Sequence, residues 1–173
     1  MMFNVGDQAV YPAHGVGVIS GVESREIAGS KQTFYILKIL DTGITIMVPT
    51  QNAQGIGMRS IIEQSRVPEV FEILRQKDVP VENQTWNRRY REYMSKIKTG
   101  SLFEIAKVLR DLAHLKGDKA LSFGERKMFE KACSLLVKEI SMALKTDEEV
   151  IESELQGIFQ EYQRPAGESQ PAA

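Results

Sequence analysis

Hydrophobic and polar positions alternate in short runs over roughly the first third of the chain. β-prone side chains gather at residues 9–11, 17–19, 33–40 and 44–48, and glycines recur between these runs. Residues 28–30 and 41–43 are typical hairpin turns, because glycine tolerates the positive φ at which strands reverse. The pattern predicts several short strands joined by tight turns.

Two prolines fit the same picture. Pro12 and Pro49 follow β-prone residues directly, and proline is tolerated where a strand ends or lies at a sheet edge. Short strands at this spacing predict a small twisted barrel or curled sheet. Such a barrel leaves little room for a ligand cavity, so we expect it to serve as a docking module.

From about residue 66 the hydrophobic period becomes that of helices. Residues 67–74 place apolar side chains at helical spacing with Pro68 in the first turn, and residues 78–80 should end this helix. Thr85 can cap the next helix, which begins at Trp86 and stops at Gly100.

Three capping-box patterns predict the starts of the remaining helices. They are formed by Ser101 and Glu104, Ser122 and Glu125, and Thr146 and Glu149. The apolar stripes that follow them are Leu102, Ile105, Ala106, Leu109 and Leu112; Phe123, Phe129, Ala132, Leu136 and Ile140; and Val150, Ile151, Leu155, Ile158, Phe159 and Tyr162. Residues 117–118 should break the chain between the first two of these helices.

The predicted fold class is therefore α+β: a small N-terminal β-barrel followed by a compact bundle of about five helices. We expect the barrel in residues 1–65 and the bundle in residues 66–162. Residues 163–173 are rich in Pro, Gly, Ser and Ala, and we expect them to be disordered.

Composition places the chain among ordinary globular proteins. Its 173 residues are 42% hydrophobic and 26% charged, and no apolar run approaches the roughly 20 residues of a membrane span. The N-terminus lacks the pattern of a signal peptide, and Cys133 is the only cysteine. These features predict a cytoplasmic protein without a membrane partner.

Charge is unevenly distributed along the chain. Residues 81–145 carry 14 basic and 8 acidic side chains, a net of +6, whereas residues 146–173 carry 1 and 7, a net of −6. The basic segment favours a nucleic-acid surface, although the solvated face of one helix would give the same count. The acidic segment 146–161 is either the outer face of the last helix or a partner for the basic one.

Aromatic and basic residues alternate at the start of the most basic stretch. Trp86, the only tryptophan, opens the segment WNRRYREY and is followed by Lys96 and Lys98. Basic side chains attract phosphates, and flat rings can wedge between bases. Helical phase sets Trp86 with Tyr93 and other apolar residues, which favours the core, whereas its first-turn position would let the ring project beyond the bundle.

Catalytic and metal-binding patterns are weak. His14 and His114 lack a second ligand at metal spacing, so surface or capping roles are expected, and Cys133 is expected to be a buried helical thiol. Residues 15–17 (GVG) start like a dinucleotide fingerprint but lack its third glycine and βαβ setting, so these glycines are expected in turns. We predict a non-enzymatic protein without a metal or other cofactor.

Several motifs in order resemble the CarD/CdnL family of bacterial transcription factors, and the CdnL branch most. They are VGD at 5–7, VYP at 10–12, GVG at 15–17, TWNRRY at 85–90, VLRDL at 108–112 and LSFGERKM at 121–128. The resemblance implies a Tudor-like N-terminal domain that docks on the RNA polymerase β subunit. It also implies a helical domain that contacts promoter DNA at the upstream edge of the bubble and stabilises the open complex.

The resemblance also suggests roles for individual residues. Trp86 matches the family tryptophan that wedges into the minor groove, Arg88 and Arg91 match its basic neighbours with Arg89 beside them, and Arg126 matches another basic position near DNA. In the β domain, Arg25 matches a polymerase-facing residue, while Met47 and Pro49 fall on the docking strand. One branch of the family has an arginine at the position of Met47, so the polymerase contact of this chain would be apolar rather than ionic there.

The resemblance implies DNA binding without a long recognition sequence and association with the nucleoid through RNA polymerase. Because docking would raise the local concentration near the fork, we expect weak affinity for free DNA, and we expect a monomer. Two other functions stay open from the residues themselves. A stand-alone architectural protein would use the basic helix on duplex DNA without polymerase. A protein–protein adaptor would instead set the basic helix against an acidic partner.

Overall fold

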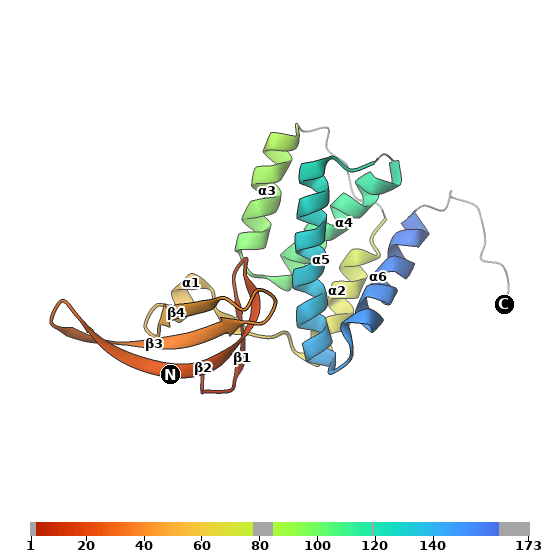
Figure 1. Ribbon diagram of the computed structural model, residues 1–173. Helices are drawn as coiled ribbons and strands as arrows, with labels where there is room; N and C mark the ends of the chain where they lie inside the picture. Colours follow the sequence, from red (N-terminus) through yellow and green to blue (C-terminus); the bar gives the residue numbers. More distant parts are fainter. Residues whose placement is uncertain (1–2, 78–84, 119, 163–173) are drawn as a thin grey trace.

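The N-terminal part of the chain is a five-stranded antiparallel sheet in the computed structural model, which describes residues 3–77, 85–118 and 120–162. The strands lie in the order β4-β3-β2-β1-β5 (Figure 1). Their bounds are β1 (Gln8–Tyr11), β2 (Gly15–Ile27), β3 (Ser30–Ile39), β4 (Thr45–Pro49) and β5 (Arg59–Ser60). Each of the four predicted runs lies largely within one strand, and Pro49 ends an edge strand as expected.

The longest strands form a hairpin that projects from the body of the molecule (Figure 1). Ile27 pairs with Ser30 across Ala28 and Gly29, whose φ angles are 52° and 79°. Positive φ at both turn residues is the type I′ geometry that suits tight hairpins, so this predicted turn is confirmed. The pattern predicts only residues 17–19 of β2. It misses the rest of the strand because the outer residues of the hairpin are exposed and do not alternate between buried and exposed positions.

Gly17 lies within β2, so its prediction as a turn residue is wrong. A Cβ there would lie 2.7 Å from both Leu37 Cδ1 and the Lys38 carbonyl oxygen. Only glycine lets β2 and β3 approach this closely.

The buried side of the sheet is completed by α1 (Ala53–Ile56), and its core is formed by Phe3, Ala9, Ile19, Tyr35, Leu37, Ile39, Val48, Ala53 and Met58.

Five helices form the rest of the described structure after a single 3-10 turn, η1 (Gln64–Arg66). They are α2 (Val67–Leu74), α3 (Trp86–Lys98), α4 (Leu102–Asp118), α5 (Phe123–Leu144) and α6 (Glu148–Tyr162). The predicted fold class, a Tudor-like small β-barrel followed by a helical bundle, is confirmed. The domain bounds remain a prediction, and the predicted disordered tail, 163–173, lies outside the described residues.

Helix ends agree with the sequence in part. Ser122 and Glu125 form both hydrogen bonds of the predicted capping box, and Gly100 follows α3 with φ +74°. Thr85 precedes α3 but its side chain makes no capping bond. The predicted break at 117–118 coincides with the last two residues of α4, and one predicted end is wrong: α2 stops at Leu74, four residues before the 78–80 segment, which lies outside the described residues.

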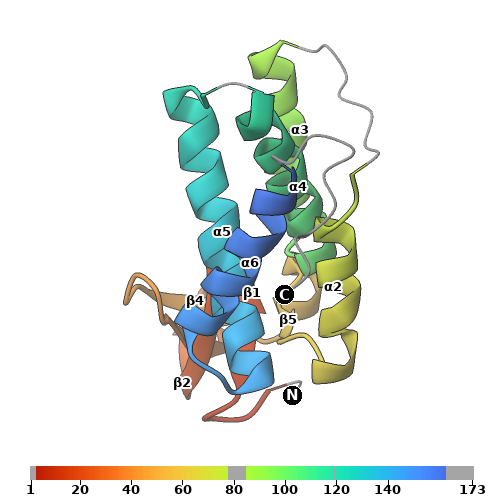
Figure 2. The ribbon, with the colours of Figure 1, turned by 90° about the vertical axis from the view of Figure 1, so that its right-hand side faces the viewer.

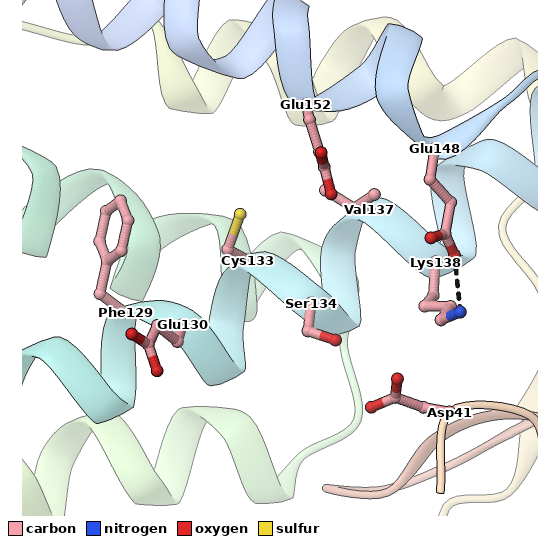
Figure 3. Close-up of a pocket in the computed structure, with 9 residues that line it drawn as sticks. All are labelled: Asp41, Phe129, Glu130, Cys133, Ser134, Val137, Lys138, Glu148 and Glu152. Carbon is pink, nitrogen blue, oxygen red and sulfur yellow. Dashed lines mark ion pairs between the residues drawn. The ribbon is translucent and has the colours of Figure 1, made fainter.

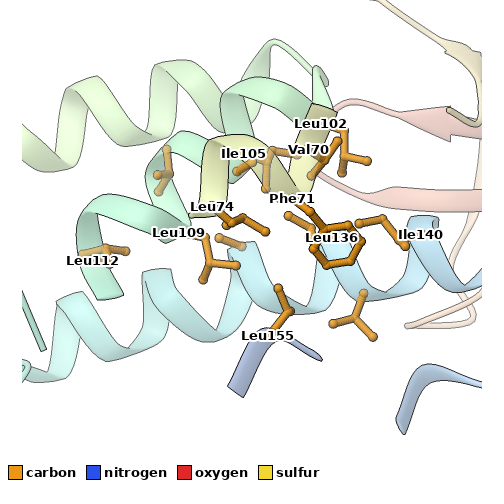
Figure 4. Packing of buried hydrophobic residues seen from close by; sticks show 14 of the residues in the cluster. Val70, Phe71, Leu74, Leu102, Ile105, Leu109, Leu112, Leu136, Ile140 and Leu155 are labelled. Carbon is orange, nitrogen blue, oxygen red and sulfur yellow. The ribbon is translucent and has the colours of Figure 1, made fainter. Parts of the chain in front are cut away.

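Apolar faces of α2, α4, α5 and α6 meet in the core of the bundle (Figure 4). Leu74, Leu109, Leu112, Leu136 and Ile140 are fully buried there. Phe123 and Val150 were predicted in the apolar stripes, and both predictions are wrong, since their side chains are 73% and 47% exposed. Each belongs to a first helical turn, and the buried stripe of α6 instead follows Ile151, Leu155 and Ile158.

A buried ion pair joins the sheet to the helices. Arg59 of β5 donates to both carboxylate oxygens of Glu139 in α5 at 2.7 and 2.8 Å, and also to the Gly100 carbonyl. The Ile62 N–H donates to Glu139 at 2.8 Å. Glu139 is only 2% exposed, and a charge this buried is stable only when it is fully paired. This network therefore fixes the sheet against the long central helix.

Candidate nucleic-acid interface

Trp86 lies at the end of the helical domain that is far from the sheet. Both α3 and α5 begin there (Figures 1 and 2). Its ring is half-buried and packs on the backbone of Gly124, the second residue of α5, and on the Tyr90 ring at 5.7 Å. Further along α3, Tyr93 and Ile97 are buried. The apolar face of α3 thus runs from the core to an exposed edge, and Trp86 occupies that edge.

The three arginines of α3 have different environments. Arg88 and Arg91 are exposed. Arg89 turns inward, where its side chain is 15% exposed, and pairs with the buried Glu125 across 3.8 Å. Its guanidinium also lies 5.8 Å from the Trp86 ring centre. Arg88 and Arg91 can therefore reach a phosphate directly, whereas the placement of Arg89 favours holding Trp86 against α5.

Arg126 brings a further cation to this end from the first turn of α5. Its side chain is exposed, as is that of Lys127. Helix N-termini carry partial positive charge from unpaired N–H groups, and two of them meet here. We call Trp86, Arg88, Arg91 and Arg126 the Trp86 edge. Its members come from two helices far apart in sequence, and they place one half-buried ring and three exposed cations at the same end of the molecule.

Gly124 positions the Trp86 ring, and sequence analysis missed it. A Cβ at Gly124 would lie 3.1 Å from Trp86 Nε1 and 3.3 Å from Cζ2, closer than such atoms normally approach. We expect Gly124→Ala to displace the ring toward solvent and to shift the fluorescence of this sole tryptophan to longer wavelength. Helix propensity favours alanine by roughly 0.5–1 kcal/mol, which offsets part of the packing lost when the ring moves, so the unfolding free energy should change little.

A matched control for Gly124→Ala is Gly157→Ala, in α6. A Cβ there meets nothing within 4 Å, so the same change of backbone propensity occurs without a contact to Trp86. Its emission should equal that of the parent protein. An unshifted emission maximum for Gly124→Ala as well would show that Gly124 does not hold the ring.

The edge strand β4 is the second candidate surface, because its outer side presents backbone hydrogen-bonding groups. The Thr50 N–H donates to Thr33, and the Ile44 carbonyl accepts from Ile39. Hydrogen bonding alternates along an antiparallel pair of strands. The backbone N–H and C=O groups of the even-numbered residues of β4 therefore point toward β3, while those of Thr45 and Met47 point outward. Pro49 ends this row without an N–H. The edge can therefore accept another extended strand.

Arg25, Met47 and Pro49 lie on one face of the sheet. Pro49 pairs with Phe34, which pairs with Glu23, and Arg25 follows two residues later on β2. Residues directly opposite one another, and residues two apart, project to the same face. Arg25 itself is exposed and pairs with Glu23 at 3.3 Å. The structure thus groups the three predicted docking residues on one face, with Arg25 farther out along the hairpin.

Cys133 lines a groove of about 310 Å³ between α5, α6 and Asp41 (Figure 3). Burial, and secondarily Glu152, raises the pKa of its thiol, which keeps it protonated and weakly nucleophilic. Lys138 there pairs with Glu148 at 2.8 Å. Among the described residues, no three His, Cys, Asp or Glu side chains gather as a metal site would require.

The two histidines make structural contacts. His114 stacks on Tyr162 at 4.1 Å between ring centres and hydrogen-bonds the Gln76 carbonyl. His14 lies edge-on against Tyr11 after the first strand.

Across the described part of the chain, every helix is too short or too polar to cross a bilayer.

Comparison with known sequences identifies the family. The pattern described as the CarD-like/TRCF RID domain matches residues 3–62, and that of the CarD C-terminal domain matches residues 69–156. The chain belongs to the CarD family. This membership makes it a transcription regulator and confirms the resemblance read from its motifs. The Trp86 edge lies within the part of the chain that matches the CarD C-terminal domain.

Individual proteins are similar to all or part of this chain. "Putative transcription factor YdeB" of Bacillus subtilis (strain 168) is 32% identical over 156 residues, covering 88% of this chain and 99% of that protein. The CdnL N-terminal domain of Myxococcus xanthus is 47% identical over 36% of this chain and 87% of its own, with a TM-score of 0.31. The 72-residue N-terminal domain of CarD from the same organism is 37% identical over 34% and 79%, with a TM-score of 0.30.

Proposed function

We propose that this protein docks on the β subunit of RNA polymerase through β4 and stabilises the open promoter complex through the Trp86 edge. The observation that carries the proposal is that the half-buried Trp86 ring and the exposed Arg88, Arg91 and Arg126 lie at the same end of the bundle, where α3 and α5 begin. A ring inserted at a DNA fork offsets part of the unstacking cost, and arginines hold phosphates without reading sequence.

The docking half of the proposal rests on the outward-facing backbone of β4. A partner strand can extend the sheet by main-chain hydrogen bonds, and side chains on the shared face then decide which strand fits. Met47 and Pro49 supply apolar surface there, and Arg25 supplies charge farther out. Pairing on one edge with an apolar face fits a specific protein contact better than a nucleic-acid contact.

The two sites can act together because they lie on different parts of the molecule, so the protein can bind polymerase and DNA at the same time. The β4 edge belongs to the sheet, and the Trp86 edge belongs to the first turns of α3 and α5, which begin at the end of the helices that is far from the sheet (Figure 1). Docking raises the local concentration of a weak DNA binder near the fork. The Arg59–Glu139 network joins the two parts, so polymerase binding also orients the DNA-contacting end.

The proposal is tested by the lifetime of open complexes challenged with a competitor that traps released polymerase. Adding the full-length protein to cognate polymerase on a promoter with a short-lived open complex should lengthen that lifetime several-fold. Its affinity for a β-subunit fragment that carries the upstream lobes is measured in parallel. An unchanged lifetime together with absent β-fragment binding would refute the proposal. Tight binding to duplex DNA alone would favour a stand-alone architectural protein.

Met47→Arg provides a prediction specific to the docking strand. A charged side chain should disfavour the apolar contact at this edge and weaken binding to the β fragment about tenfold, which corresponds to about 1.4 kcal/mol. The matched control is Ser153→Arg, which adds the same charge at an exposed position of α6. Both variants are titrated against the β fragment. Equal affinities of Met47→Arg and Ser153→Arg for the fragment would show that Met47 is not part of the contact.

A further inference from the structure

Phe123 is the most exposed large hydrophobic side chain in the described part of the chain. It is 73% exposed, compared with 63% for Val5. Exposed apolar residues are common when they occur singly, so exposure alone assigns no role. Its position is informative, because Phe123 directly precedes Gly124, the residue on which the Trp86 ring packs.

The backbone at Phe123 is held firmly. Ser122 accepts a hydrogen bond from the Glu125 N–H, and the Glu125 carboxylate accepts one from the Ser122 N–H. These paired bonds fix the first turn of α5. Phe123 therefore presents its ring from a rigid position, which lowers the entropic cost of contacting a ligand.

One cation lies close to the Phe123 ring, and a second is exposed on the same helical turn. Lys127 lies 5.4 Å from its centre, and Arg126 is exposed on the same turn. The nearest carboxylate in sequence, Glu125, is 4% exposed and turns toward Arg89. Lys127 also meets Glu130 one turn further along, at 3.9 Å. An aromatic ring among basic side chains matches a nucleic acid, whose phosphates pair with the cations and whose bases stack on the ring.

We propose that Phe123 is a second DNA-contacting ring, which stacks on an unpaired base beside the site that Trp86 occupies. This inference rests on the proposed function and adds the melted strand as the ligand of this end of the molecule. Trp86 is half-buried against α5 and presents one edge, whereas Phe123 is open to solvent over most of its surface. The two rings project from adjoining helix starts, so one fork can engage both.

The test compares Phe123→Ala with the parent protein in open-complex lifetime. Stacking of a base on an aromatic ring contributes about 1–3 kcal/mol by alanine substitution, so the lifetime gain that the protein provides should fall at least fivefold. Phe123→Leu, which keeps apolar volume without a flat ring, should recover little of it. A promoter carrying 2-aminopurine in the melted strand at the upstream fork should show less quenching with Phe123→Ala, because stacking on the ring is lost.

Two further variants keep the result interpretable. Val150→Ala removes another exposed hydrophobic side chain from a first helical turn, in α6, and should leave the lifetime unchanged. Trp86→Ala is measured alongside. If Trp86→Ala shortens the lifetime and Phe123→Ala does not, this inference is overturned and the proposed function stands. If neither has an effect, the proposed function itself fails.

Thermal unfolding and polymerase binding complete the test. Because Phe123 is exposed, its removal should leave the unfolding midpoint unchanged, so loss of lifetime cannot be attributed to misfolding. Affinity for the β fragment should also stay unchanged. Weaker polymerase binding by Phe123→Ala, with no change in the 2-aminopurine signal, would make the ring a protein contact and overturn the assignment to DNA.

Discussion

Trp86→Ala should shorten the lifetime of the open complex about tenfold or more while leaving affinity for the polymerase β fragment unchanged. Unstacking at a fork costs a few kcal/mol, and an inserted ring offsets part of that cost. Alanine keeps the helix but offers no surface to wedge against a base. Because Trp86 is the first residue of α3, and α3 begins at the end of the molecule that is far from β4 (Figure 1), docking should be unaffected.

A control must account for the packing that the tryptophan also provides. Its half-buried ring contacts Gly124 and Tyr90, so we expect a moderate fall in the unfolding free energy of about 1–2 kcal/mol. Phe103→Ala removes another half-buried ring, near the start of α4, and should cost a similar amount of stability without shortening the lifetime. Equal lifetimes for Trp86→Ala and the parent protein would eliminate the wedge.

Glu139→Ala should lower the unfolding free energy by about 2–4 kcal/mol. The substitution leaves the Arg59 guanidinium and the Ile62 N–H without their acceptor. Breaking a buried pair typically costs 3–5 kcal/mol, and we take a lower range because the Arg59 side chain is 30% exposed. Denaturant unfolding of the full-length chain measures the change.

Glu104→Ala is the matched control, since it removes a glutamate from a surface pair with Lys107 in which both partners are about a third exposed. Such pairs contribute at most about 1 kcal/mol. The double variant Arg59→Met/Glu139→Leu separates pairing from packing, because replacing both charges leaves neither unpaired. It should be more stable than Glu139→Ala. A Glu139→Ala variant as stable as Glu104→Ala would show that the network does not fix the domains.

Local patterns predicted most elements because their signals are short-range. The turn at Ala28 and Gly29, the capping box at Ser122 and the stop at Gly100 each depend on a few neighbouring residues. The outer part of the β2–β3 hairpin was missed because it is exposed and lacks alternation. β5 was missed because two residues carry no pattern. Phe123 and Val150 were misassigned because a helical stripe does not show where the bundle ends.

The sequence by itself determined the two-part α+β fold, the basic stretch around Trp86 and the family, because periodicity, charge and ordered motifs are properties of the chain. Only the tertiary structure decided how the residues are combined. It set Gly124 beneath Trp86, turned Arg89 inward to Glu125, and left Phe123 exposed. It also joined Arg59 to Glu139, 80 residues away. Contacts between distant residues depend on how helices and sheet pack, and no local pattern encodes that packing.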